Sequence, residues 1–160
     1  MDTLKYVMGQ NLIAGIMLAL IMTGQVTKPS QIKGDVSKTE IYDLASEIEL
    51  EVGNGDDETK LLCGSVVINR INSSKWKGST VEEVVMAKEG KYWQYAETTR
   101  NNLKSHKPST HSKLLAKYLL VYGVVCPENV MYQGMNYNGH GTYMEKDIVG
   151  QKKTEKFCYE

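Results

Sequence analysis

Residues 59–71, TKLLCGSVVINRI, constrain the fold more than any other part of the chain, because apolar residues would face almost every side of a helix formed by them. A helix that is apolar all round is normally covered by other elements. We therefore predict a central helix here, with the rest of the chain packed around it. The chain has 160 residues, 41% of them hydrophobic, which is enough for one sizeable core and requires no second domain.

A second helix is predicted to begin after Ser37, because Ser37 and Glu40 have the S-x-x-E spacing of a capping box. Apolar residues then recur every three or four positions and form one stripe: Ile41, Leu44, Ala45, Ile48 and Val52. Glu51 falls on the edge of this stripe, whereas Glu47 lies further round and Glu49 points more nearly outward. The pattern thus places one acid, Glu51, against apolar surface.

Three further elements are predicted downstream. Ser79 and Glu82 have a second capping-box spacing, and the segment VEEVVMAKEG after them should be a short helix that stops at Gly90. Another helix is expected over residues 109 to about 125, closed by Pro127. The remainder, from NVMYQ to the terminal EKFCYE, suggests two short strands joined by a loop.

The N-terminal segment resembles the apolar region of a signal peptide. Residues 12–22, LIAGIMLALIM, carry no charge, and this run is short for a bilayer span. We expect residues 1–24 to be a signal or membrane anchor, residues 25–38 a polar linker and residues 39–160 the folded domain. The chain would then be exported, to the cell envelope, outside the cell or onto a virion if it comes from a bacteriophage. Whether the segment is cleaved stays open, as does the alternative that it is a buried helix of the domain.

Charge and cysteine content narrow the class of partner. Lys and Arg number 19, as do Asp and Glu, so the excess of positive charge typical of nucleic-acid binders is missing. A neutral polysaccharide would suit such a surface. Cys63, Cys126 and Cys158 form no C-x-x-C pair, so we expect neither a metal site nor a cofactor. Cys63 is interpreted as a small buried residue, and pairing of Cys126 with Cys158 in an exported protein stays open.

Glu51 is the candidate catalytic residue. Cleavage of a glycosidic bond needs a carboxylic acid that is still protonated near neutral pH, and apolar surroundings raise a carboxyl pKa by penalising the ionised form. The alternative is that Glu51 is a solvated acid near a helix end. A second carboxylate could come from Asp56, Asp57 or Glu58, although acids in such a loop more often serve solubility or helix capping.

Aromatic and amide side chains are the candidates for substrate binding. Aromatic rings pack on the C–H faces of sugar rings, and amides bind their hydroxyl groups. The segment KYWQY is the densest aromatic patch, and the glycine-rich loop NYNGHGTY could bring a histidine close to a ligand. Core packing of the same rings is the equal alternative. The candidates are Tyr92, Trp93, Gln94, Tyr95, Tyr137 and His140.

Two stretches resemble the cell-wall hydrolase family typified by the spore cortex-lytic enzymes of the SleB and CwlJ type. LASEIELEVGNG from Leu44 is similar to the family's L-A-x-x-I-x-x-E-A-x-G-E, and CGSVVINRI from Cys63 is similar to V-G-A-V-V-L-N-R-V. GKYWQY and the terminal KFCY approximate two further landmarks, so the resemblance covers roughly residues 41–159. The family's first glutamate falls on Glu51, but its second falls on Gly55 and the histidine of its last strand on Lys156.

The resemblance implies cleavage of the β-1,4 bond between N-acetylmuramic acid and N-acetylglucosamine in peptidoglycan, in several members by lytic transglycosylation. Glu51 would act as the single acid and base, while Asn69 and Arg70, which match the family's asparagine–arginine pair, would be structural. Gly55 motivates the alternative of a wall-binding or assembly protein, of an envelope or virion, that has lost catalysis. The fold expected is α+β: a mainly helical single domain, lysozyme-like in layout, with a small C-terminal antiparallel β element.

Overall fold

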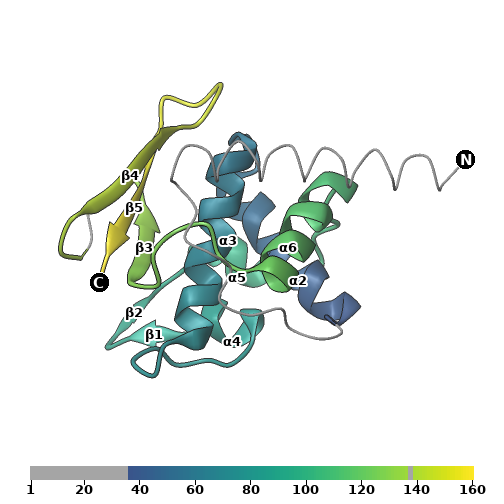
Figure 1. The fold of residues 1–160 in the computed structure, drawn as a ribbon, viewed down its shortest axis with the longest axis horizontal. Helices are drawn as coiled ribbons and strands as arrows, with labels where there is room; N and C mark the ends of the chain where they lie inside the picture. The colour runs from purple at the N-terminus through teal and green to yellow at the C-terminus, as the bar shows by residue number, and fades with distance from the viewer. Residues whose placement is uncertain (1–35, 137–138) are drawn as a thin grey trace, which may run out of the picture.

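The computed structural model describes residues 36–136 and 139–160, which form a single α+β domain (Figure 1). Its helices are α2 (Lys38–Val52), α3 (Asp57–Asn72), α4 (Val81–Val85), α5 (Glu97–Asn102) and α6 (Thr110–Tyr122). Its strands are β1 (Lys88–Glu89), β2 (Tyr92–Trp93), β3 (Val130–Gly134), β4 (Thr142–Asp147) and β5 (Thr154–Tyr159). The expectations for residues 1–24 and for most of residues 25–38 lie outside the described residues. Within the described ranges, no helix has the length and apolar character needed to cross a membrane.

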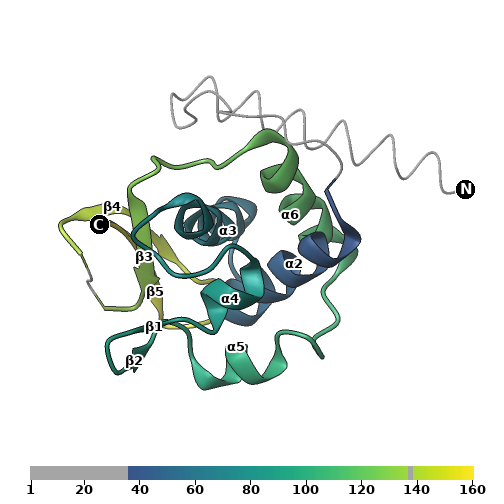
Figure 2. The same cartoon turned by 90° about the horizontal axis from the view of Figure 1, so that it is seen from below.

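Helix α3 is the central helix, as predicted. Every residue from Leu61 to Arg70 is buried, and α3 packs against α2, α4, α6 and β3. Figure 2 shows α3 nearly end-on, with these helices on one side of it and the strands on the other. The packing is close at Gly64, where an added Cβ would lie 2.6 Å from Leu119 Cδ1 and 2.9 Å from Ile48 Cδ1. A larger residue at position 64 would therefore push α2 and α6 away from α3.

Helix α2 begins with the predicted capping box. The Glu40 N–H donates to Ser37 Oγ at 3.1 Å, and the Ser37 N–H donates to Glu40 Oε2 at 3.0 Å. The predicted apolar stripe is buried, apart from the partly buried Ile41 at its start. The buried face is wider than the stripe, however, because Glu47 and Asp43 are buried as well. Glu47, which was predicted to lie further round the helix from the apolar stripe than Glu51, is therefore inside the core.

The C-terminal β element is an antiparallel sheet of three strands in the order β3-β5-β4, not the two strands predicted. The last strand along the chain, β5, is thus the central strand of the sheet. Its Phe157 is fully buried, as is its neighbour Cys158. This arrangement inserts β5 between the earlier strands, and the residue after it, Glu160, forms an ion pair with Lys75 in the turn after α3.

The segment between α3 and α6 departs most from the sequence prediction. The cap of α4 is Thr80, not Ser79, because the Glu83 N–H donates to Thr80 Oγ1 at 3.2 Å. The helix ends at Val85, and Gly90 instead forms the turn between β1 and β2 with a φ of 60°. Helix α5 was not predicted. Helix α6 begins after the predicted cap but ends at Tyr122, because Gly123 adopts a φ of 102° that only glycine favours.

All three cysteines are buried free thiols, so the Cys126–Cys158 pair is not formed in the structure.

Glu49 fastens α2 to the loop before α6, and its removal should weaken the fold at neutral pH. Its carboxylate lies 2.8 Å from His106 Nε2 and accepts from the Ser109 N–H at 2.9 Å. Burial alone would raise the pKa of Glu49, but hydrogen bonds from Ser109, Ser112 and His106 outweigh it and lower the pKa to about 2. We expect Glu49→Gln to lower the free energy of unfolding by about 2 kcal/mol at pH 7.

The stabilisation by Glu49 is present above its ordinary pKa and is lost as the pH falls through about 2. Urea unfolding of Glu49→Gln and wild type should therefore differ at pH 7 and converge near pH 2. Glu128→Gln, at an exposed position, is the matched control. An equal difference between Glu49→Gln and wild type at both pH values would contradict this account.

Candidate active site

Glu51 lies in the last turn of α2, half-buried, as its place at the edge of the apolar stripe predicted. The buried hydroxyl of Thr99, on α5, donates a 2.5 Å hydrogen bond to Glu51 Oε1. Burial raises the pKa of the Glu51 carboxyl, and the negative charge of Glu155 adds to this, whereas Thr99, Lys153 and Arg70 oppose it. The result is an acid that keeps its proton to a higher pH than a free glutamate and still reaches the surface.

Glu47 lies one turn before Glu51 and is completely buried, with 0% of its surface exposed. The Cys63 thiol donates to Glu47 Oε1 with an S–O distance of 3.5 Å, and Gln133 Nε2 donates to the same oxygen at 3.3 Å. Burial, reinforced by the charge of Glu51, raises the pKa of Glu47 well above its ordinary value. The sequence interpretation missed this group. Its four-residue spacing from Glu51, which puts both acids on one helical face, was the available signal.

A third carboxylate, Glu155 on β5, completes the acidic cluster formed by Glu47, Glu51 and Glu155. Glu155 is 1% exposed, and Lys153 Nζ lies 3.0 Å from its Oε2. Its negative charge raises the pKa of Glu51. Two buried carboxylates, Glu47 and Glu155, therefore act electrostatically with Glu51, and the sequence prediction included neither of them.

The loop acids that were candidates for a second carboxylate have structural partners instead. Asp56 caps α3 by accepting from the Thr59 N–H at 2.7 Å. Asp57 lies 2.7 Å from His111 Nε2, and Glu58 forms an ion pair with Lys146. The capping alternative is thus confirmed for Asp56.

Asn69 and Arg70 are structural, as predicted. Asn69 Nδ2 donates to the carbonyls of Pro127 at 2.9 Å and Val130 at 3.1 Å. The Arg70 Nε donates to the Met131 carbonyl at 2.7 Å. These bonds fasten the end of α3 to the start of the C-terminal sheet.

The buried Arg70 guanidinium also organises aromatic rings beside the acidic cluster. It lies 4.3 Å from the centroid of the Trp76 ring and 5.3 Å from that of Tyr95. Its positive charge lowers the pKa values of Glu47 and Glu51 against the larger effect of burial. Arg70 is thus the link between the acids and the aromatic side chains.

The predicted sugar-binding residues fall into different environments. Tyr92 and Trp93, on the β1–β2 hairpin, are 66% and 44% exposed, and Gln94 Nε2 donates to Glu89 Oε2 at 3.2 Å. Tyr95 is only 4% exposed, so the core-packing alternative holds for it. His140 is exposed and its backbone N–H donates to the Tyr159 carbonyl at 3.0 Å. Tyr137 lies outside the described residues.

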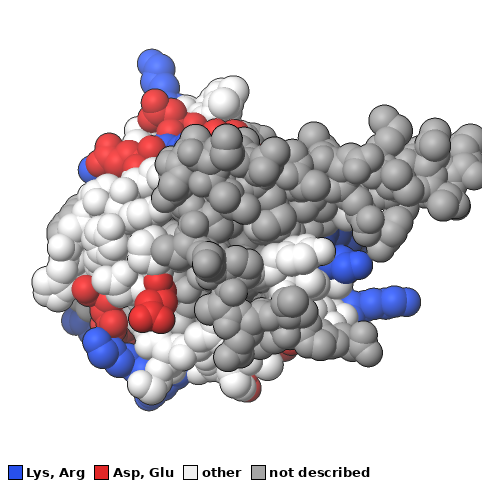
Figure 3. All heavy atoms as spheres, viewed as in Figure 1, with Lys and Arg blue, Asp and Glu red and all other residues white. Residues whose placement is uncertain are grey.

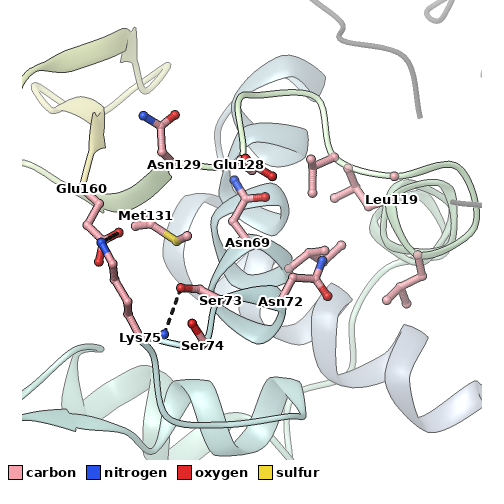
Figure 4. Close-up of a pocket in the computed structure, with 14 residues that line it drawn as sticks. Asn69, Asn72, Ser73, Ser74, Lys75, Leu119, Glu128, Asn129, Met131 and Glu160 are labelled. Carbon is pink, nitrogen blue, oxygen red and sulfur yellow. Dashed lines mark hydrogen bonds and ion pairs between the residues drawn. The ribbon is translucent and has the colours of Figure 1, made fainter. Parts of the chain in front are cut away.

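Two hollows lie near the end of α3, and neither is lined by Glu51, Tyr92 or Trp93. The larger, of about 550 Å³, is shown in Figure 4, where Asn69 points from α3 toward the loop that carries Glu128 and Asn129. The smaller, of about 250 Å³, is on the side of the β1–β2 hairpin. The Lys75–Glu160 ion pair, at 3.0 Å, lines both hollows.

Charge is mixed on the described surface. Figure 3 shows acidic and basic side chains next to one another along one edge of the molecule, with uncharged surface between the groups. In the described ranges, no cluster of three or more His, Cys, Asp or Glu side chains is arranged to hold a metal ion. Carboxyl groups such as that of Glu51 can donate and accept protons.

Comparisons with protein-family models, with curated proteins and with solved structures gave no match to this chain.

Proposed function

We propose that the chain cleaves the β-1,4 bond between N-acetylmuramic acid and N-acetylglucosamine of peptidoglycan, as a lytic transglycosylase with Glu51 as its acid. The observation that carries this proposal is that Glu51 combines a raised pKa with access to the surface. Glu47 and Glu155 are too deeply buried to touch a polymer. Such a substrate would place the chain outside the cytoplasm, in agreement with the signal-like N-terminal sequence.

In the proposed mechanism Glu51 first donates its proton to the glycosidic oxygen, and the bond from that oxygen to the anomeric carbon of the muramic acid breaks. The Glu51 carboxylate then accepts the proton of the muramic acid 6-hydroxyl as that oxygen attacks the anomeric carbon. The products are a 1,6-anhydro sugar and a free 4-hydroxyl on the leaving strand. Thr99 would hold the carboxyl in one orientation throughout.

We propose also that the layout is lysozyme-like, with an acid at the end of one helix, a central helix behind it and a small antiparallel sheet beside it. In lysozyme itself, a glutamate in an apolar pocket has a raised pKa and acts as the general acid. The equivalent features here are Glu51, α3 and the β3-β5-β4 sheet.

A second candidate function, wall binding without catalysis, is favoured by Gly55. A Cβ at this position would lie 2.9 Å from the Thr59 side chain and 3.0 Å from the Val52 carbonyl. The second glutamate of the family could therefore not be introduced without a shift of the turn.

Product analysis separates the two functions. Purified peptidoglycan incubated with the protein should release soluble muropeptides, and mass spectrometry should find 1,6-anhydro ends. Reducing ends would indicate hydrolysis instead. Binding to insoluble peptidoglycan without any soluble product would favour the non-catalytic function.

Removal of the Thr99 hydroxyl should shift the pH dependence of cleavage. The Thr99 hydrogen bond lowers the pKa of Glu51, so Thr99→Val should raise it further. Because the acid must be protonated, activity falls as the pH rises through this pKa, and the alkaline limb should move to higher pH. The measurement is kcat/KM against pH on soluble glycan fragments, with Thr99→Ser as the control that keeps the hydroxyl. If the alkaline limb of Thr99→Val stayed in place or moved to lower pH, the proposed effect of Thr99 on the pKa of Glu51 would be refuted.

A further inference from the structure

The smaller hollow has aromatic walls. It lies between the turn after α3, the β1–β2 hairpin and β3, and both Trp76 and Tyr132 line it. The two rings meet edge to face, with centroids 5.4 Å apart and planes at 71°. Both are half-buried, so each ring is fixed on one side and open on another. The sequence interpretation assigned no role to either residue.

The aromatic walls are held rigidly. The Arg70 guanidinium lies 4.3 Å from the Trp76 ring centroid and is itself fixed by its bond to the Met131 carbonyl. The Lys75–Glu160 ion pair lies where this hollow adjoins the larger one, because both residues line both hollows. A site with walls already ordered loses less conformational entropy when a ligand binds.

Polar groups at the rim suit a sugar. Gln94 and Glu89, joined by a hydrogen bond of 3.2 Å, both line the hollow, and they offer an amide and a carboxylate to hydroxyl and acetamido groups. Aromatic walls with a few polar groups are the usual composition of a small-molecule site. The volume, about 250 Å³, lies below the range of about 300–1,000 Å³ typical for a whole ligand. The hollow therefore fits one ring of a longer chain.

Arg70 connects the hollow to the acidic cluster. Arg70 contacts Trp76 in the wall of the hollow and Tyr95 behind it, and the charges of Glu47 and Glu51 act on Tyr95. The hollow is therefore joined to the site of Glu51 through Arg70 and Tyr95.

We propose that the hollow walled by Trp76 and Tyr132 binds one N-acetylhexosamine ring of a β-1,4-linked strand, at a position other than the bond that is cleaved. This inference rests on the proposed function, because the strand is the substrate assigned to Glu51. The ring packs its C–H face on the aromatic wall, and Gln94 and Glu89 bind its polar groups.

Tryptophan fluorescence tests the subsite directly. The chain has two tryptophans, so Trp93→Phe leaves Trp76 as the only one, and Glu51→Gln in the same protein prevents cleavage of the ligand. Titration with the β-1,4-linked tetrasaccharide of N-acetylglucosamine should change the Trp76 emission in a saturable manner. Tyr132→Ala and Gln94→Ala should each weaken binding about tenfold, which is about 1.4 kcal/mol. Tyr122→Ala, an exposed aromatic on α6, is the control and should leave affinity unchanged.

The outcomes of this titration distinguish failure of the proposed subsite from failure of the proposed activity. Unchanged Trp76 emission, or equal affinity in Gln94→Ala and the parent protein, would overturn the subsite even if wild type cleaves peptidoglycan through Glu51. Saturable binding that depends on Gln94 and Tyr132, without cleavage by wild type, would support the subsite and overturn the proposed activity. If Tyr132→Ala does not fold, Gln94→Ala decides alone, because its half-buried side chain contributes little to the core.

Discussion

Glu51→Gln is expected to lower the rate of peptidoglycan cleavage by about 10³-fold, within the range of about 10²–10⁴ that general acid–base catalysis contributes. Glutamine has nearly the same shape and its carbonyl oxygen can still accept from the Thr99 hydroxyl, so the site should keep its geometry. The Glu51→Gln variant lacks the acidic proton that Glu51 would transfer to the glycosidic oxygen. The loss should therefore appear in kcat, because binding of the strand does not need that proton.

The measurement is the release of soluble muropeptides from purified peptidoglycan by wild type and variant at equal concentration. Glu97→Gln, an exposed glutamate on α5, is the control for the same chemical change elsewhere. A melting temperature of Glu51→Gln at least as high as that of wild type would show that the variant keeps the fold, because glutamine also removes a carboxyl whose pKa is raised by burial. Activity of Glu51→Gln at the wild-type level would exclude Glu51 as the acid.

The features predicted correctly from the sequence are those encoded locally. The capping box at Ser37 and the all-round apolar character of α3 each depend on residues within one helix. The burial of Glu51 at the edge of a stripe follows from helical phase in the same way. Such signals need no knowledge of what packs against the helix.

The features missed depend on contacts between distant segments. Helical phase could not show that Cys63 and Gln133 cover the face of α2 that carries Glu47. Nor could it show that β5 returns to the centre of the sheet and brings Glu155 toward α2. The buried carboxylates Glu47 and Glu155 therefore escaped the sequence prediction, whereas the proposal that Glu51 is the single acid stays a prediction.

The sequence also failed to predict α5 and the start of α4, which are both short helices. Helix α5 has no side-chain hydrogen bond at its cap, so its sequence carries no start signal, yet it supplies Thr99. The cap of α4 lies one residue later than predicted, because both Ser79 and Thr80 precede suitable acids and only the Thr80 side chain accepts from the backbone of Glu83. In a five-residue helix, no apolar period was available to choose between them.

Glu47→Gln is expected to make the protein more stable at pH 8, in contrast to most substitutions of fully buried residues. In the unfolded chain Glu47 titrates near its ordinary pKa of 4.5, whereas burial raises its pKa well above this value in the fold. At pH values between these two pKa values, the folded state binds more protons than the unfolded state. The free energy of unfolding therefore falls as the pH rises, by about 1.4 kcal/mol per pH unit. Because glutamine cannot ionise, Glu47→Gln does not lose free energy of unfolding in this way as the pH rises. Its carbonyl oxygen can accept from Cys63 and Gln133, which both donate to Glu47 Oε1.

Urea unfolding at pH 5 and pH 8 checks this prediction. The free energies of unfolding of Glu47→Gln and wild type should be similar at pH 5, and the variant should be the more stable at pH 8. Glu51 has a raised pKa of the same sign, but it is present in both proteins, so their difference isolates Glu47. Glu47→Ala is the contrasting variant: it leaves a cavity and two donors without their acceptor, and should lose about 2–4 kcal/mol at pH 5. Its loss relative to wild type should be smaller at pH 8, because alanine also removes the group that ionises. If Glu47→Gln were instead destabilised equally at pH 5 and pH 8, Glu47 would be ionised in the fold, and the Arg70 charge would outweigh burial.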